Sequence, residues 1–312
     1  MRLSSIALFA STATAISFSG SSIVTNYFSR RDGHNKCPAI WNTISKDLTS
    51  RFLANGQCNP DARAAIRAIF HDCGAWNTAQ GAKGGCDGSL AIAPGEIDRS
   101  ENKGLANIIA MLKNMANTYN VGVADMIVFA GNHAIVTCPG GPRVQTYIGR
   151  TDSTTPAPNG LLPDVNADPA ALSRLFTDKG FSDRDLAALL GAHSTSNQFH
   201  FDTSTANVGA SQDSTPGVWD VKYYSETLNP PKGIVVFPSD SKLAQYKGVG
   251  KEFNGFVNNA GKWNGKFADA MAKMALFGSG NTKNMADCTD SLPKTTNAKR
   301  ELKAINPFMP RY

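Results

Sequence analysis

Residues 59–73 read NPDARAAIRAIFHDC, and this stretch indicates the kind of fold that the chain adopts. Asn59 is a favoured residue just before a helix, and Pro60 is favoured at the first helical position. We therefore predict that a helix runs through the rest of the stretch. Arg67 and His71 stand four residues apart, so their side chains project from the same face of this helix.

Helical spacing also dominates the rest of the chain. Apolar residues recur at steps of three and four within residues 101–119, which marks one face of a helix. Residues 125–136 are apolar nearly all round, which is typical of a buried helix. A capping box at residues 182–185 begins a helix whose apolar stripe leads to His193. The one β-branched run, residues 234–237, is short, so we predict a mainly α fold.

The composition is that of an ordinary globular protein. The 312 residues are 41% hydrophobic and 18% charged, which excludes collagen-like, coiled-coil and wholly disordered chains. The net charge is +6, from 31 basic and 25 acidic residues, but three of the basic residues lie in the first 31 positions. The remaining 28 against 25 leave +3, which is too mild for a nucleic-acid-binding surface. We expect no nucleic-acid partner.

The first 31 residues have the layout of a secretory signal peptide and a possible propeptide. One arginine precedes a short apolar stretch, which ends in the small residues Ala13-Thr14-Ala15. The apolar run is too short to span a bilayer, so we expect a secreted, extracellular protein without membrane association. The pair Arg30-Arg31 is either a second, dibasic processing point or two solvated arginines.

Loop-like segments suggest how the chain is divided. Residues 139–169 are rich in proline and glycine and are the best candidate for a boundary between two halves. We predict one helical domain over residues 32–160 and a second over residues 161–312, the latter with a C-terminal tail. A second long loop, residues 202–217, is rich in serine, threonine and aspartate. Loops of this length in compact proteins are usually functional or held by a metal ion.

Six cysteines follow the predicted processing region. An even number of cysteines in a secreted chain favours three disulfides, although spacing alone does not choose among the possible pairings. Zinc would need clusters of cysteine or histidine at close spacing, such as C-x-x-C, and the sequence has none. We therefore predict disulfides and no zinc site.

The helix with Arg67 and His71 carries residues suited to proton transfer. A permanent cation beside an imidazole is a poor core component, but it suits a site where a proton moves and negative charge develops. The alternative is a solvated arginine beside an unremarkable histidine. Asp72 follows directly, and the turn at residues 85–89 adds a second carboxylate and a hydroxyl. Such hard oxygen ligands suit calcium, and a plain polar turn is the alternative.

A second group of polar residues follows His193. This histidine continues an apolar stripe, so we expect its helix to direct it into the interior, where a lone histidine is more often a packed core residue than a ligand. Ser194 comes next, and residues 213–220 offer two carboxylates, a hydroxyl and a carbonyl, which is a second candidate calcium site. Asp240 is placed to hydrogen-bond the far nitrogen of a metal-ligating imidazole.

Five motifs in this order, RAIFHDC, GCDGS, LLGAHS, DSTPGVWD and PSD, resemble those of the secreted fungal haem peroxidases, class II of the plant-type superfamily. The resemblance covers residues 37–288, and its cysteine pattern resembles a divergent, ascomycete-like branch. It implies a mainly helical, two-domain fold with haem b between the domains. Residues 32–160 are the expected distal domain, and residues 161–312 the expected proximal domain.

The resemblance implies a role for each residue of the haem pocket. His193 is the expected iron ligand, and Asp240 accepts a hydrogen bond from its other ring nitrogen. His71 is the expected distal base, which takes a proton from hydrogen peroxide and returns it to the departing oxygen. Arg67 stabilises the charge that develops as the O–O bond breaks, and Phe70 forms a wall of the pocket.

The resemblance also implies supporting residues and two calcium ions. Asn102 accepts a hydrogen bond from the outer N–H of His71, and Glu96 supports Asn102. The expected distal calcium ligands are Asp72, Gly85, Asp87 and Ser89, and the expected proximal ones are Ser194, Asp213, Thr215, Val218 and Asp220. The implied disulfides are Cys37–Cys288, Cys58–Cys138 and Cys73–Cys86.

Departures from the resembling family indicate the substrate. Manganese-oxidising members carry acidic residues at the positions of Pro60, Ala64 and Phe199, so no hard-oxygen manganese site can form from them here. Lignin-oxidising members carry a surface tryptophan at the position of Ala188. We therefore expect direct oxidation of small phenols or similar donors at the haem edge. Trp76 is either an alternative entry point for electrons or, as is more common, a packed or simply exposed side chain.

The expected partners are hydrogen peroxide and small aromatic reductants, and the chain is predicted to be a monomer. Two other functions stay open at this point. One is a secreted haem-binding or interaction protein of the same fold with weak or lost turnover, and the other is a calcium-held extracellular structural protein without haem. Gln212 stands where many members have an apolar or aromatic residue. It either alters the redox potential or reflects a slip of the alignment.

Overall fold

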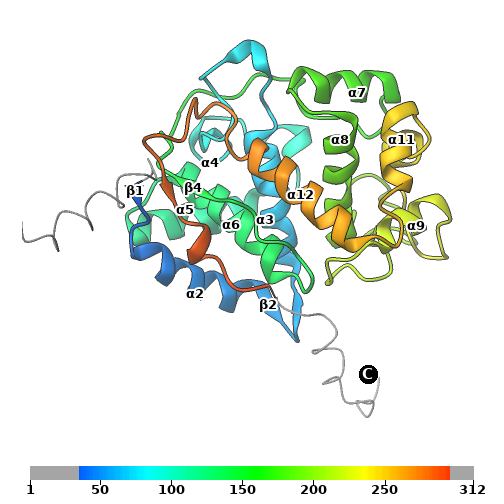
Figure 1. Cartoon of the computed structure of the whole chain (residues 1–312), viewed down its shortest axis with the longest axis horizontal. Coiled ribbons are helices and arrows are strands. Elements are labelled where there is room, and N and C mark those ends of the chain that lie inside the picture. Colours follow the sequence, from blue (N-terminus) through cyan, green and yellow to red (C-terminus); the bar gives the residue numbers. More distant parts are fainter. Residues whose placement is uncertain (1–34, 296–312) are drawn as a thin grey trace, which may run out of the picture. The chain divides into compact units, whose positions relative to one another are not determined.

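The computed structural model describes residues 35–295 (Figure 1). The predicted signal peptide and propeptide, residues 1–31, lie outside this part of the chain. The described residues form eleven α-helices and a few very short strands, which confirms the mainly α prediction. The helices are α2 (Ile40–Phe52), α3 (Pro60–Cys73), α4 (Ser89–Ile92), α5 (Ala106–Tyr119), α6 (Val123–Thr137), α7 (Pro169–Asp178), α8 (Asp183–Leu190), α9 (Lys222–Leu228), α10 (Pro238–Leu243), α11 (Lys247–Asn254) and α12 (Ala260–Met274).

The strands are two residues long and form two small sheets. They are β1 (Asn35–Lys36), β2 (Leu53–Ala54), β3 (Gln57–Cys58), β4 (Tyr147–Ile148) and β5 (Ala286–Asp287). In one sheet β5 lies between β1, to which it is parallel, and β4, to which it is antiparallel. In the other sheet β2 and β3 form an antiparallel hairpin, in which Leu53 pairs with Cys58.

The predicted start signals of the helices are present. The Asn59 side chain accepts a hydrogen bond from the backbone N–H of Ala62 at 3.1 Å, which satisfies one of the free donors at the start of α3. At α8 the side chain of Ser182 caps the backbone of Asp185, and the Asp185 side chain caps the backbone of Ser182. Every residue of α6 is buried, as the apolar sequence around all its faces predicts.

The predicted loops are present, and the β-branched run is not a strand. The segment between α6 and α7 holds β4 and no helix, and residues 202–217 hold neither a helix nor a named strand. Residues 234–237 belong to no named helix or strand, although Val235 donates its backbone N–H to Ser211 at 3.0 Å. Pro238 then begins α10, and this leaves the run too little length to form a ladder.

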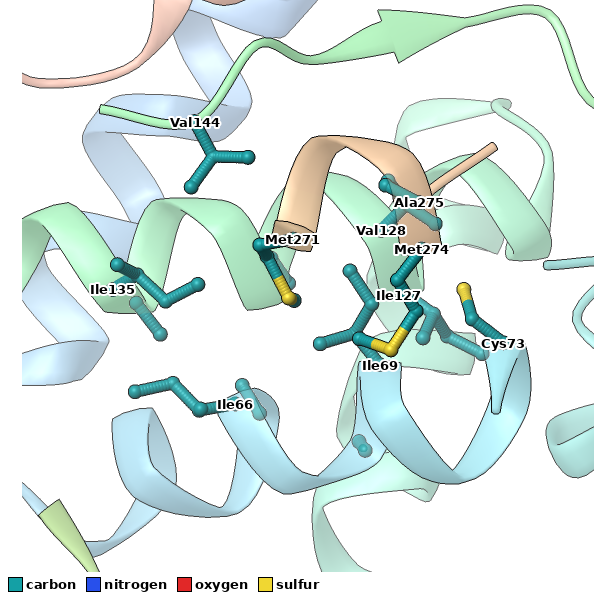
Figure 2. Close-up of a cluster of buried hydrophobic side chains, with 14 of the residues drawn as sticks. Ile66, Ile69, Cys73, Ile127, Val128, Ile135, Val144, Met271, Met274 and Ala275 are labelled. Carbon is teal, nitrogen blue, oxygen red and sulfur yellow. The ribbon is translucent and has the colours of Figure 1, made fainter. Parts of the chain in front are cut away.

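Helices α3, α6 and α12 share an apolar core (Figure 2). Side chains from the three helices meet there, and they include Ile66, Ile69, Ile127, Met271 and Met274, all at most 6% exposed. Helix α6 passes close to α3 at Gly131, where an added Cβ atom would lie 2.4 Å from Cγ2 of Ile69. Gly131 therefore sets how closely α6 approaches the helix that carries Arg67 and His71.

Three disulfides cross-link the described part of the chain. They are the three pairs that the family resemblance implies: Cys37–Cys288, Cys58–Cys138 and Cys73–Cys86. The third pair joins the end of α3 to the turn before α4. All described residues fall within one compact unit. The boundary between residues 160 and 161 stays a prediction. Within residues 35–295, no helix has the length and apolar character needed to cross a membrane.

The close approach at Gly131 predicts that adding a methyl group there changes stability in the opposite direction from adding one at an open glycine. We expect Gly131→Ala to destabilise the protein by about 1–3 kcal/mol, because the new methyl group must push α3 away from α6. Gly265→Ala in α12 is the matched control, since a Cβ atom there meets nothing within 4 Å. It should stabilise the protein by about 0.5–1 kcal/mol. Denaturant unfolding measures both changes, and equal effects would contradict the prediction.

Candidate active site

His71 lies near the end of α3 and is held at one ring nitrogen. Its Nδ1 is 2.9 Å from Oδ1 of Asn102, while the amide nitrogen of Asn102 donates to the backbone carbonyl of Glu96 at 2.7 Å. An amide oxygen only accepts hydrogen bonds, so Nδ1 of His71 carries the proton. Nε2 is then an unprotonated base, and it has no hydrogen-bond partner among the described residues.

The surroundings of His71 keep the ring neutral. Burial, and then the positive charge of Arg67, lower the pKa of His71 to about 3, although the hydrogen bond to Asn102 acts in the opposite direction. The side chain is 9% exposed. A neutral imidazole with a free Nε2 can accept a proton at neutral pH, as general base catalysis requires.

The same short turn positions Arg67. The guanidinium donates to the backbone carbonyls of Glu101 at 2.9 Å and of Lys103 at 2.8 Å, on either side of Asn102. Burial lowers the pKa of Arg67 to about 10, so the group is still a cation at neutral pH. Residues 101–103 therefore fix both an imidazole and a positive charge on the face of α3.

Glu96 supports Asn102 through its backbone rather than its side chain. The carboxylate instead accepts from the backbone N–H of Ala157 at 2.7 Å and from the hydroxyl of Ser89 at 3.4 Å. This buried carboxylate thus ties residue 157 to the segment that holds Asn102. The sequence spacing predicts that Glu96 and Asn102 lie together, but it cannot tell which atoms of Glu96 make the contact.

Phe70 packs against the edge of His71. The two ring centroids are 5.8 Å apart and nearly perpendicular, and Phe70 also stacks on Phe176 of α7 at 6.4 Å. Phe70 is half-buried. This placement is compatible with a wall of the pocket.

His193 lies in a short 3₁₀ helix, Gly191–Thr195, rather than on α8. The sequence stripe predicts a continuous helix that directs this residue inward, but α8 ends at Leu190 and the histidine side chain is 32% exposed. Its Nδ1 is 2.7 Å from Oδ2 of the buried Asp240, on α10. The rings of Tyr223 and Phe237 contact it edge-on, at centroid distances of 5.8 and 5.6 Å.

A third histidine shows what a purely structural imidazole looks like in this chain. Nε2 of His133 is 2.9 Å from the carbonyl of Ser45, and its Nδ1 is 3.1 Å from the hydroxyl of Thr137. Both ring nitrogens are engaged, whereas Nε2 of His71 and of His193 has no hydrogen-bond partner among residues 35–295. An imidazole oriented by a carboxylate and free at Nε2 has the chemistry of an axial haem ligand, so His193 fits that group.

The expected distal calcium ligands lie close together. The Asp72 carboxylate accepts from the backbone N–H groups of Gly88 at 3.1 Å and Leu90 at 3.3 Å. Burial, and then the charge of Asp87, raise the pKa of Asp72 well above its ordinary value. A cation between the two carboxylates would relieve this repulsion. Ser89 is engaged with Glu96, so this hydroxyl has a competing partner.

The expected proximal calcium ligands include two unpartnered buried oxygens. Asp213 and Ser194 are both fully buried, and neither Oδ2 of Asp213 nor Oγ of Ser194 has a hydrogen-bond partner among the described residues. Burial, followed by the charges of Asp220 and Glu226, raises the pKa of Asp213 to about 7. Thr215 donates to Asp220 at 2.9 Å, and its backbone donates to Asp213 at 2.8 Å. These oxygens fit a calcium ion.

No group of three or more His, Cys, Asp or Glu side chains suited to a metal ion occurs within residues 35–295. Each calcium site would therefore use two carboxylates, completed by hydroxyl and carbonyl oxygens. The described donors match this composition better than they match a transition metal.

Two residues near the site have no signal in the sequence. Lys179 is 1% exposed, and its ammonium group donates to the carbonyls of Gly74, Trp76 and Leu161 at 2.6–2.8 Å. It ties the end of α7 to the segment after α3. His200 lies beside the segment after the Ser100–Asn102 turn, because a Cβ atom on Gly104 would be 2.7 Å from its Nε2. Burial, and then the charges of Lys103 and Arg67, lower its pKa.

Comparison with known proteins identifies the class of the chain. A family model described as Peroxidase matches residues 44–259. The chain is 30% identical to versatile peroxidase VPS1 of Pleurotus eryngii, over 82% of this chain and 75% of that protein. It is 32% identical to a low-redox potential peroxidase of Taiwanofungus camphoratus, over 81% and 77% of the two chains. It is 30% identical to ligninase C of Trametes versicolor, over 80% and 73%.

The match to the family model alone covers more than half of the chain, and the relatives extend it over about four fifths. These similarities define the class of the protein, which is that of the haem-dependent oxidoreductases. The chain belongs to the peroxidase family and is a haem peroxidase of the fungal class II type.

With His71 as the expected base, its low pKa predicts the acid limit of the reaction with hydrogen peroxide. The base must be neutral to accept a proton, so the rate constant should stay level from pH 7 to about pH 4 and fall as the pH approaches about 3. Arg67→Leu removes a like charge, which favours protonation, so the fall should move to higher pH. Rapid-mixing kinetics, with the haem absorbance as a check on folding, measures this. An unmoved limit would contradict the prediction.

The unpartnered oxygens near Asp213 predict a calcium-dependent stability. Calcium should raise the midpoint of thermal unfolding and a chelator should lower it, because an ion that binds only the folded chain stabilises that state. Asp213→Asn should remove most of the proximal part of this effect. Asp269→Asn, at an exposed position on α12, is the control that should keep it. The same unfolding midpoint with calcium and with chelator would refute the role.

Proposed function

We propose that this chain is a secreted haem peroxidase that uses hydrogen peroxide to oxidise small phenolic or similar donors at the haem edge. One observation carries the proposal: two histidines are each held at Nδ1 by a buried oxygen and are each without a hydrogen-bond partner at Nε2 among residues 35–295. One is beside a fixed cation and suits proton transfer. The other is beside a buried carboxylate and suits iron ligation.

His193 would hold the iron through Nε2, while Asp240 accepts the Nδ1 proton and fixes the ring. Haem, when bound, supplies the iron that gives electrons to hydrogen peroxide and regains them from the donor. The hydrogen bond to Asp240 increases the negative character of the imidazole, which strengthens it as a ligand. The edge-on rings of Tyr223 and Phe237 keep the imidazole from rotating.

His71 moves the proton of the reaction. Its Nε2 takes a proton from one oxygen of hydrogen peroxide and delivers it to the other, so that this oxygen leaves as water rather than as hydroxide. Asn102 keeps the proton on Nδ1 throughout the transfer. Arg67 places a positive charge beside the oxygen that becomes negative as the O–O bond breaks, and the carbonyls of Glu101 and Lys103 prevent it from swinging away.

Two specialised routes for electrons are not supported by the residues present. Pro60, Ala64 and Phe199 stand where a manganese site would need carboxylates. Ala188, at the position of the surface tryptophan, is buried beneath Trp263, whose indole donates to its carbonyl at 3.0 Å. All four tryptophans of the chain are at most 9% exposed, including Trp76, which stacks on Phe277 at 4.4 Å.

An exposed aromatic segment supports small aromatic donors. Phe199 is 54% and Phe201 39% exposed, and they flank His200, which lies beside the turn that holds Arg67. Phe201 also contacts Phe237, a neighbour of His193, at a centroid distance of 5.3 Å. Exposed rings between the two sides of the site offer packing surface to another aromatic ring.

We also propose that calcium ions bind at both predicted sites, that residues 32–160 and 161–312 form the distal and proximal domains, and that the chain works as an extracellular monomer. Three disulfides support an oxidising compartment. The competing function, a haem-binding protein without turnover, would not need an Arg67 and a His71 fixed in this way. Retention of both supports an active enzyme.

Haem-reconstituted protein tests the proposal. It should show a Soret band and oxidise phenols with hydrogen peroxide, while manganese and a bulky high-potential dye should be poor donors. His71→Ala should keep the Soret band and slow the reaction with peroxide by several orders of magnitude, of which general acid–base catalysis accounts for about 10²–10⁴-fold. Stopped-flow absorbance measures the rate. Unchanged turnover would remove His71 from its role, and a missing Soret band would overturn the proposal.

A further inference from the structure

Gln212 is a buried polar residue in contact with the carboxylate of Asp240. Its side chain is 1% exposed, and Nε2 lies 3.3 Å from Oδ2 of Asp240. The backbone N–H of Gln212 donates to Ser196 at 3.1 Å, which anchors the residue to the segment just after the 3₁₀ helix of His193. Gln212 is therefore tied by its backbone to the segment after His193 and by its side chain to Asp240.

The contacted oxygen is shared by three donors. Oδ2 of Asp240 is 2.7 Å from Nδ1 of His193, 2.9 Å from the hydroxyl of Tyr223 and 3.3 Å from the amide of Gln212. The other oxygen, Oδ1, accepts from the hydroxyl of Ser239 at 3.0 Å. The Nδ1–H of His193 therefore shares the negative charge of this oxygen with two neutral donors.

The orientation of the Gln212 amide follows from chemistry. A carboxylate that receives an imidazole N–H and a phenol O–H acts as an acceptor, so the amide must present its nitrogen and not its oxygen. This leaves Oε1 of Gln212 buried without a hydrogen-bond partner among the described residues. An unpaired buried oxygen costs stability, and an apolar side chain would avoid that cost. The amide makes a hydrogen bond to Asp240, which an apolar side chain could not make.

We propose that Gln212 and Tyr223 are positioning residues that weaken Asp240 as an acceptor for His193 and thereby raise the reduction potential of the bound iron. The inference rests on the proposed function, because it takes His193 as the iron ligand. Each additional donor on Oδ2 stabilises the negative charge there, so Asp240 draws the Nδ1 proton of His193 less strongly. The imidazole then carries less negative charge and donates less to the ferric state, which is the state that anionic ligands favour.

The test compares reduction potentials of haem-loaded variants. Gln212→Leu removes one donor, and Tyr223→Phe removes the other at nearly constant volume. Both should lower the ferric/ferrous midpoint potential relative to the unmodified protein, and the double variant should lower it further. The iron–histidine stretching band of the ferrous protein in resonance Raman spectra should shift to higher frequency in the same order, because the imidazole becomes a stronger ligand.

Tyr224→Phe is the matched control. Tyr224 is equally buried and adjacent in sequence, but its hydroxyl donates to the carbonyl of Ala187 at 3.0 Å and does not contact Asp240. It should leave both the potential and the stretching band unchanged. If Gln212→Leu does not fold, Tyr223→Phe still decides, since it deletes a single oxygen atom.

The outcomes separate this inference from the proposed function. One outcome would overturn the inference alone. In it the unmodified protein shows a normal iron–histidine band, but the reduction potential of Gln212→Leu and Tyr223→Phe does not shift or shifts upward. Shifts of equal size in Tyr224→Phe would also overturn it, because they would indicate general loosening. An unmodified protein without an iron–histidine band would overturn both the inference and the ligand role of His193.

Discussion

The function proposed for this protein depends on a hydrogen bond at Nδ1 of each of two imidazoles. Asn102 holds the Nδ1 proton of His71, and Asp240 holds that of His193. Each acceptor is at most 2% exposed, so water does not replace it. Because the two acceptors differ, one neutral and one anionic, two side chains of the same kind have different surroundings, which suit the two roles proposed for them: proton transfer for His71 and iron ligation for His193.

The remaining structure serves to keep these acceptors in place. The turn before α5 carries Asn102 and also offers the two carbonyls that fix Arg67, so one backbone segment aligns base and cation. On the other side, α10 brings Asp240 to a histidine 47 residues earlier in the chain. The tight contact at Gly131 packs α3, which carries Arg67 and His71, closely against α6. Backbone carbonyls thus hold Arg67 and Asn102, whereas side chains hold the two imidazoles.

Much of this arrangement is predictable from the sequence, and the reasons for the failures are physical. Helices α3, α6 and α8 carry start signals or apolar periods over many residues, so local sequence specifies them. The five strands have two residues each, a length at which no alternation can exist. The end of α8 before His193 has no sequence signal either, because the same types of residue form 3₁₀ turns and α-helices. Lys179 and Gln212 find their partners through tertiary folding, and the atoms that they bind cannot be read from spacing.

The disulfide between Cys37 and Cys288 joins residues 251 positions apart, so it turns nearly the whole described chain into a covalent ring. Strands β1 and β5 end next to this disulfide, and their parallel pairing keeps the two segments in register. A protease that cuts the exposed loop at residues 203–206 would open this ring at one point, and both pieces would stay linked. A nicked molecule would therefore migrate as a single species until a reductant is added. In a protease-rich environment such a ring tolerates a first cleavage without losing a fragment.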